Sequence, residues 1–243
     1  MDMIQITVIA ITTVYVLTWI FNHIFEPGAL RRVIQNKTAP KVQGRIRFIE
    51  KKLFAGVNGK AIAERAAAAH GWHQQDLLYG DVDPYGFYQL LVLAEANDQD
   101  TFYDLGSGIG KAVFTAALCA EIPRCIGIEL IPELYLTSAR LLHRFYQLAA
   151  HDHTLSPYTN HLLFCENNFF NVDISDATLI FINATAFSTS QWLQIIEFFD
   201  MLSSGTRLIV TSYTLPDDRY VLLHEGPAVM SWGVVTCHIY QKI

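Results

Sequence analysis

The chain has 243 residues, of which 51% are hydrophobic, and its formal net charge at pH 7 is −6. This length limits it to one domain of ordinary size plus an extension, and the apolar content is ample for a core. Four scattered cysteines form no C-x-x-C pair, and the nine histidines have metal-ligand spacing only at His151 and His153, in a polar loop that we interpret as solvated. We therefore predict no metal site, and free thiols in a reducing compartment.

The first segment is apolar: the 19 residues from Met3 to Phe21 carry no charge. As a helix rising ~1.5 Å per residue it would extend ~28 Å, close to the hydrocarbon thickness of a bilayer. Asp2 precedes the segment, and aromatic rather than small residues end it, so it does not resemble a cleavable signal peptide. We predict a retained transmembrane anchor over residues 1–25, with a buried core helix as the alternative.

Charge then divides the chain. Residues 26–65 contain ten Lys or Arg against three acidic residues, whereas residues 66–243 contain seven against 19. Basic residues directly after an apolar span indicate the cytoplasmic side and would lie against anionic headgroups. We therefore predict a basic juxtamembrane and connecting helical segment at 26–71, and a single-pass membrane protein whose domain at 72–243 faces the cytoplasm. The alternative partner, nucleic acid or an acidic protein, is less favoured because few aromatic residues lie among these charges.

From residue 61 onward, helical stretches and β-rich runs alternate. Helices are predicted at 61–70, 84–97, 111–121, 132–149 and 189–202, and strands at 101–105, 124–130, 161–166, 178–183 and 206–213. Two last runs, 220–226 and 234–242, are joined by a turn and should pair antiparallel. The fold class is therefore α/β: a doubly wound, seven-stranded, Rossmann-like sheet with a C-terminal antiparallel hairpin, preceded by the transmembrane helix.

A glycine loop follows the first predicted strand, at residues 106–110, between Asp104 and Lys111. Asp104 makes this loop a poor phosphate cradle, because a carboxylate repels the anion that a helix N-terminus attracts. Glu129, at the end of the next strand, can accept from both hydroxyls of a ribose. These residues favour a ligand with a ribose and positive charge but no phosphate, S-adenosylmethionine. The alternative is that Asp104 merely caps the following turn.

Six segments carry a resemblance to a known family, and they occur in the order YGDVDPYGF, FYDLGSGIGKAVFTAAL, GIELIPELY, NNFFNVDISDATLIFINATAF, GTRLIV and MSWG. Together they resemble the non-SET histone lysine methyltransferases of the disruptor of telomeric silencing type, within the seven-strand S-adenosylmethionine-dependent methyltransferases. The resemblance covers about Tyr79 to the C-terminus, and it implies that residues 72–243 form the methyltransferase domain.

The resemblance also implies roles for individual residues. The implied cofactor-binding residues are Tyr79 and Asp81 in a loop over the methionine end, Asp104, Gly106 and Gly108 at the methionyl and ribose part, Glu129 at the ribose, and Asn168 and Phe169 at the adenine. The implied catalytic residues are Asn183 at the methyl end, Phe187 in the lysine channel, Trp232 near its mouth, and Tyr79.

Two positions depart from the family pattern. Asn168 stands in NNF where the family has G-D-F, so an amide replaces the carboxylate that would accept from the adenine amine. Cys237 lies in TCH, where the family tends to carry a tyrosine after its S-W block. The long basic tail of some relatives is absent downstream.

From these features we predict an S-adenosylmethionine-dependent protein-lysine methyltransferase that is anchored in a membrane. Its expected substrate is a histone-like or membrane-associated protein, and nucleosome or nucleic-acid contact is possible but not favoured. The alternatives are methylation of a small molecule or lipid, and a non-catalytic membrane-anchored scaffold that keeps the fold.

Overall fold

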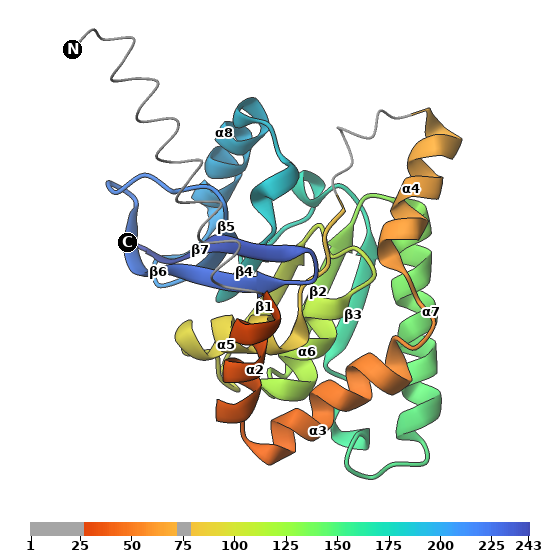
Figure 1. Ribbon diagram of the computed structural model, residues 1–243. Coiled ribbons are helices and arrows are strands. Elements are labelled where there is room, and N and C mark those ends of the chain that lie inside the picture. Colours follow the sequence, from red (N-terminus) through yellow and green to blue (C-terminus); the bar gives the residue numbers. More distant parts are fainter. Residues whose placement is uncertain (1–26, 72–78) are drawn as a thin grey trace, which may run out of the picture.

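A computed structural model describes residues 27–71 and 79–243 as a seven-stranded sheet with helices on both faces (Figure 1). The strands are β1 (Thr101–Leu105), β2 (Arg124–Glu129), β3 (Leu162–Glu166), β4 (Leu179–Ile182), β5 (Arg207–Thr211), β6 (Tyr220–Met230) and β7 (Gly233–Lys242). Their order is β3-β2-β1-β4-β5-β7-β6, with β1 to β5 parallel and β7 antiparallel to both of its neighbours. The predicted sheet and its C-terminal hairpin are therefore confirmed.

The helices form two layers. They are α2 (Pro27–Lys37), α3 (Pro40–Phe48), the π-helix η1 (Ile49–Leu53), α4 (Gly59–His70), α5 (Pro84–Leu93), α6 (Lys111–Cys119), α7 (Pro132–Ala149) and α8 (Thr189–Phe198). Short 3-10 turns are η3 (Ser156–Tyr158), η4 (Phe169–Asn171), η5 (Ala184–Ala186) and η6 (Phe199–Met201). The helices from α3 through α7 pack on one face of the sheet in one apolar core, and α8 packs on the other face in a second core (Figure 1).

Local sequence explains where these elements begin and end. The central parallel strands are buried on both faces, so β4 is a continuous apolar run in which every residue is buried, whereas the edge strand β3 exposes Leu163. Helix α5 begins at Pro84, and the Asp83 side chain caps it by accepting from the N–H groups of Tyr85 and Gly86 at 3.0 Å. Helix α4 ends at His70, and Gly71 directly after it has the left-handed conformation expected of a glycine that terminates a helix.

The predicted transmembrane helix is not supported, and the membrane localisation falls with it. In residues 27–71 and 79–243, no helix is long and apolar enough to cross a bilayer. The longest of these helices, α7, has 18 residues and carries three charged side chains, at 133, 140 and 144. The stretch predicted as the anchor, residues 1–25, lies outside the described residues. The fold is therefore corrected to an α/β sheet domain without a membrane helix in its described part.

The basic segment that follows packs against the domain, which corrects its interpretation as a lipid-contacting segment. Arg31 pairs with Asp83 at 2.7 Å. Lys41 and Arg45 both pair with Glu121, and their contacts lower the pKa of that carboxyl to about 2. Several of the charges that suggested membrane headgroups thus bind carboxylates of the domain.

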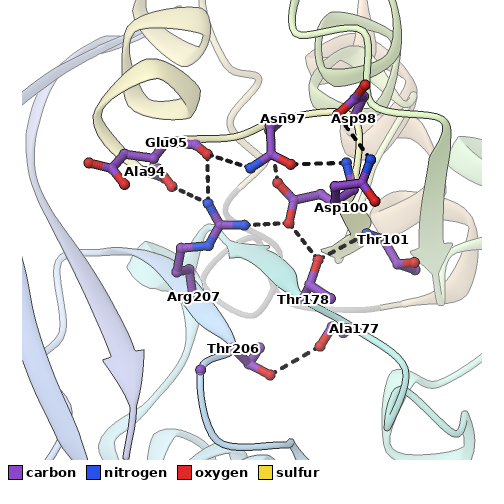
Figure 2. A network of polar contacts seen from close by, with 12 residues as sticks. Ala94, Glu95, Asn97, Asp98, Asp100, Thr101, Ala177, Thr178, Thr206 and Arg207 are labelled. Atoms are coloured by element: carbon purple, nitrogen blue, oxygen red, sulfur yellow. Dashed lines mark hydrogen bonds and ion pairs between the residues drawn. The ribbon is translucent and has the colours of Figure 1, made fainter.

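A polar network joins the amino ends of three strands, far from their carboxyl ends (Figure 2). Arg207 of β5 forms an ion pair with Asp100, which is 3% exposed, and donates to the carbonyls of Ala94 and Glu95 at 2.6 and 2.8 Å. The Asp100 carboxylate also accepts from the hydroxyl of Thr178. Because each partner is satisfied several times, this network fixes the end of the sheet opposite the cavity described next.

Candidate active site

A cavity of about 390 Å³ lies at the carboxyl ends of β1, β2 and β4. It adjoins the point where the strand order passes from β1 to β4, which is the switch point where open α/β sheets bind ligands. Its volume falls within the usual range of ligand pockets, roughly 300–1,000 Å³. Nine of the predicted site residues line it: Tyr79, Asp81, Asp104, Gly106, Gly108, Glu129, Phe169, Asn183 and Phe187.

The glycine loop between β1 and α6 depends on left-handed backbone angles. Its three glycines, at 106, 108 and 110, have φ values of 85°, 56° and 88°, which residues with a Cβ rarely adopt. The N–H groups of Gly106 and Ser107 donate to the carbonyl of Ile128 at 2.9 and 3.0 Å. The N–H of Gly108 donates to Glu129 Oε2 at 2.7 Å. Strand β2 therefore holds this loop at two points.

Glu129, the last residue of β2, also holds the start of α7. Glu129 is only 6% exposed, and its Oε1 accepts from the N–H of Ile131 at 2.8 Å. Burial raises the pKa of Glu129, while the N–H groups of Ile131 and Gly108 oppose that rise. Each carboxylate oxygen retains a free lone pair, so Glu129 can still accept from a ligand hydroxyl.

Asp104 lies in β1 and is 3% exposed. Within the described part of the chain, no donor hydrogen-bonds to its carboxylate. Burial raises its pKa well above the usual range, and the negative charges of Glu129 and Asp81 add to this effect. A buried carboxylate without donors is costly unless a cation or a proton compensates it. The cavity therefore suits a ligand that brings positive charge to Asp104.

The loop before α5 closes one wall of the cavity. Asp81 binds the Tyr79 hydroxyl through Oδ1 and Lys111 Nζ through Oδ2, the latter at 2.8 Å. The Tyr79 ring packs so closely on the glycine loop that a Cβ at Gly108 would lie 2.9 Å from it. Burial, followed by the charge of Asp81, raises the pKa of Tyr79. Tyr79 thus stays a neutral phenol that donates to Asp81.

Asn183 follows β4 directly and lies against the same loop. Its Nδ2 donates to the carbonyl of Gly80 at 3.2 Å, and its Oδ1 accepts from Thr211 Oγ1 at 2.8 Å. Phe187 is held nearby, because its carbonyl accepts from the Tyr213 hydroxyl at 2.8 Å. This wall of the cavity therefore combines one amide with one aromatic ring.

Two predicted site residues do not line the cavity. Asn168 caps η4, where its Oδ1 accepts from the N–H of Phe170 at 3.1 Å. Trp232 covers the backbone of the loop before α5, since a Cβ at Gly80 would lie 2.4 Å from its ring, and it is 43% exposed. Cys237 is fully buried in β7, opposite Thr211 of β5. No role was predicted for Cys237, and the roles predicted for the site residues, inside the cavity and outside it, stay predictions.

The predicted set lacks Lys111, which lines the cavity, and Thr211, which contacts Asn183 from β5. Lys111 directly follows the glycine loop, but its ion pair with Asp81 joins positions 30 residues apart and has no local signal. Thr211 ends β5, and the rule that points to the carboxyl ends of parallel strands could have found it.

Comparison with known proteins places the chain among histone methylation proteins and their relatives. A family model described as "Histone methylation protein DOT1" matches residues 64–227. The H3 lysine-79-specific histone-lysine N-methyltransferase of Caenorhabditis elegans is 31% identical over 136 residues, which cover 55% of this chain and 14% of that protein. A protein-lysine N-methyltransferase of Saccharolobus islandicus is 27% identical over 92 residues, which cover 38% of this chain and 50% of that protein.

Solved structures agree with the fold. The crystal structure of the MccD protein superposes with a TM-score of 0.50 at 11% identity, and the match covers 66% of this chain and 98% of that one. At this identity the likeness concerns the fold alone. Among the curated relatives, the chain spans one seventh of the Caenorhabditis elegans protein and half of the Saccharolobus islandicus protein.

Proposed function

Because the chain belongs to the DOT1 family of histone methylation proteins, we propose that it transfers a methyl group from S-adenosylmethionine to a lysine side chain of a protein. The observation that carries this proposal is the carboxylate of Asp104, which is buried and has no hydrogen-bond donor among the described residues. Asp104 lies in β1, just before the glycine loop. A ligand with an ammonium and a sulfonium group supplies the positive charge that this position lacks.

The residues of the cavity fit this cofactor. Asp104 and the glycine loop would hold its charged methionyl end, and Glu129 would accept from its ribose hydroxyls. Phe169 lines the cavity and would contact the adenine ring. When bound, S-adenosylmethionine supplies a methyl group on sulfur that a neutral amine can displace.

The lysine must reach the site as a free amine. Its pKa of about 10.4 lies ~3 units above neutral pH, so removing the proton costs about 4 kcal/mol at ~1.4 kcal/mol per unit. Phe187, beside the cavity, disfavours the ammonium form and reduces this cost. Tyr79 cannot serve as the base, because its phenol is held protonated by burial and by Asp81. We propose that the proton leaves to water.

The proposed substrate is a histone or a histone-like protein, since the relatives reported above are named for histone H3 lysine 79 and for protein lysine. Trp232, exposed beside the loop that walls the cavity, would contact the polypeptide around the target lysine. Most of the length of the histone-specific relatives has no counterpart in this chain. The position of the methylated lysine is therefore to be determined by the experiment described next.

The test uses the full chain with methyl-labelled S-adenosylmethionine and, as acceptors, recombinant nucleosomes and free histone H3. We expect label on lysine, located by mass spectrometry, and a rise in the melting temperature on adding S-adenosylhomocysteine. Asp104→Asn should abolish both, whereas Asp98→Asn, an exposed aspartate, should keep both.

Each of the other outcomes indicates a different function. A folded chain that binds no S-adenosylhomocysteine refutes the enzyme. Binding without label on either protein, but with label when a small amine or a lipid replaces the protein acceptor, indicates the small-molecule alternative. Binding without transfer to any acceptor indicates a scaffold that keeps the fold.

A further inference from the structure

The amide of Asn183 has a defined orientation in the cavity wall. Its Nδ2 faces the carbonyl of Gly80 at 3.2 Å, and a carbonyl oxygen can only accept. This contact assigns the nitrogen and the oxygen of the amide. The oxygen then faces two hydroxyls, those of Thr211 at 2.8 Å and Thr185 at 3.1 Å.

These two hydroxyls differ in freedom. Thr211 is fully buried, and its Oγ1 accepts from the N–H of Ala184 at 2.9 Å. Its single proton can reach Asn183 Oδ1 at 2.8 Å or Thr185 Oγ1 at 3.4 Å, and the contact with Asn183 is the shorter. Thr185 is exposed, and its Oγ1 also lies 2.9 Å from Ser212 Oγ. The hydroxyl of Thr185 can therefore turn to Ser212 at 2.9 Å and release one lone pair of Asn183 Oδ1, whereas the buried hydroxyl of Thr211 makes its shortest contact with Asn183 itself.

We propose that Thr211 is a positioning residue that fixes the Asn183 oxygen for the substrate amine, and that Thr185 is the exchangeable partner which the amine displaces. This inference rests on the proposed function. An acceptor that holds an N–H of the neutral amine directs the lone pair of the amine nitrogen toward the methyl group. The same acceptor stabilises the positive charge that grows on this nitrogen during transfer. Asn183 offers such an acceptor only while its amide stays in this orientation.

The two threonines therefore have opposite expected effects, although both bond the same oxygen. Thr211→Val keeps the size of the side chain but lets the amide rotate, so we expect kcat to fall about tenfold or more, equivalent to the loss of one oriented hydrogen bond. Thr211→Ser restores the hydroxyl and should recover most of kcat. Thr185→Val removes a competitor of the amine, so KM for the protein substrate should fall about twofold to fivefold.

Thr206→Val is the matched control. Thr206 lies at the other end of the strand that contains Thr211, is 3% exposed, and donates its hydroxyl to the carbonyl of Ala177 at 3.0 Å (Figure 2). It should lower the melting temperature as Thr211→Val does, since both lose a buried hydroxyl, but kcat should not change. Should Thr211→Val not fold, Thr211→Cys replaces it, and a weaker donor predicts an intermediate loss of kcat.

The experiment measures steady-state kinetics of the full chain on recombinant nucleosomes and free histone H3, and calorimetric affinity for S-adenosylhomocysteine. All variants should keep that affinity within about twofold, because the amide is proposed to act on the amine rather than on the cofactor. The inference is overturned if Thr211→Val and Thr206→Val lose kcat equally. It is also overturned if Thr211→Ser does not recover kcat, or if KM rises in Thr185→Val. A wild-type chain that methylates neither acceptor overturns the proposed function as well.

Discussion

The two hydrogen bonds of Glu129 make a quantitative prediction for the change Glu129→Gln. The carboxylate uses one oxygen for the N–H of Gly108 and the other for the N–H of Ile131, at 2.7 and 2.8 Å. A glutamine has one oxygen, so its NH₂ group must face one of these two N–H groups. One buried donor of the glycine loop or of α7 is then left unpaired.

The magnitude follows from two opposing effects. A buried donor without an acceptor costs about 1–3 kcal/mol. Burial raises the pKa of Glu129, so the neutral side chain also avoids part of the cost of burying a charge, and the net loss lies near the lower end of that range. For a protein of this size a loss of about 1–2 kcal/mol lowers the melting temperature by roughly 2–8 °C. Loss of a charged acceptor for the ribose should weaken S-adenosylhomocysteine binding at least about tenfold.

The assay combines thermal unfolding with calorimetric titration of S-adenosylhomocysteine. Glu166→Gln is the matched control, because Glu166 stands opposite Glu129 in the register of β2 and β3 but is exposed. It should leave both quantities near their wild-type values. The reasoning is refuted if Glu129→Gln melts at the temperature of Glu166→Gln and binds as tightly, since the loop would then not depend on the carboxylate.

Three further predictions concern charge, backbone strain and the far end of the sheet. Because the pKa of Asp104 is raised in the folded protein, the ligand-free protein should lose stability as pH rises through that pKa, and thermal unfolding of Asp104→Asn at several pH values should not show this slope. Calorimetric titrations of the wild-type protein should show weaker binding of S-adenosylmethionine as pH falls through the same pKa. Gly108→Ala introduces a Cβ at φ 56° and 2.9 Å from an aromatic ring, so the affinity for S-adenosylhomocysteine should fall. Gly205→Ala, at φ 90° with open space around the Cβ, should lower only the free energy of unfolding, by about 1–2 kcal/mol of backbone strain. Asp100→Asn leaves Arg207 without its ionic partner and should cost about 3–5 kcal/mol of stability, whereas binding by the folded fraction should not change; a parallel loss of affinity would contradict the separation of network and site.

The sheet was predictable because its strands are short, apolar and separated by helices with clear boundaries. Burial on both faces gives the central strand β4 a continuous apolar run, and the absence of a helix between β6 and β7 predicts their antiparallel pairing. The end of α5 was less predictable: the expected helix extends to residue 97, but the observed one ends at Leu93, and Glu95 adopts a positive φ of 54°. Local propensity does not reveal that turn.

The packing of the basic segment was not predictable from local pattern. Arg31 and its partner Asp83 are 52 residues apart, and Lys41 and Arg45 reach Glu121 across 80 and 76 residues. A charge run beside an apolar segment favours a membrane surface when only neighbouring residues are considered. The tertiary contacts change that interpretation for Arg31, Lys41 and Arg45, because these side chains form ion pairs with carboxylates of the domain.

The site illustrates the same limit at shorter range. The strand-end rule places Asp104 and Glu129 at the cavity, but it does not say how each charge is compensated. In the structure, Lys111 and the Tyr79 hydroxyl bind Asp81, and two backbone N–H groups bind Glu129. Asp104 alone of these three carboxylates has no donor among the described residues. A cationic ligand therefore gains most at Asp104, and this unequal compensation, rather than the number of acidic residues, gives the cavity its preference for charge.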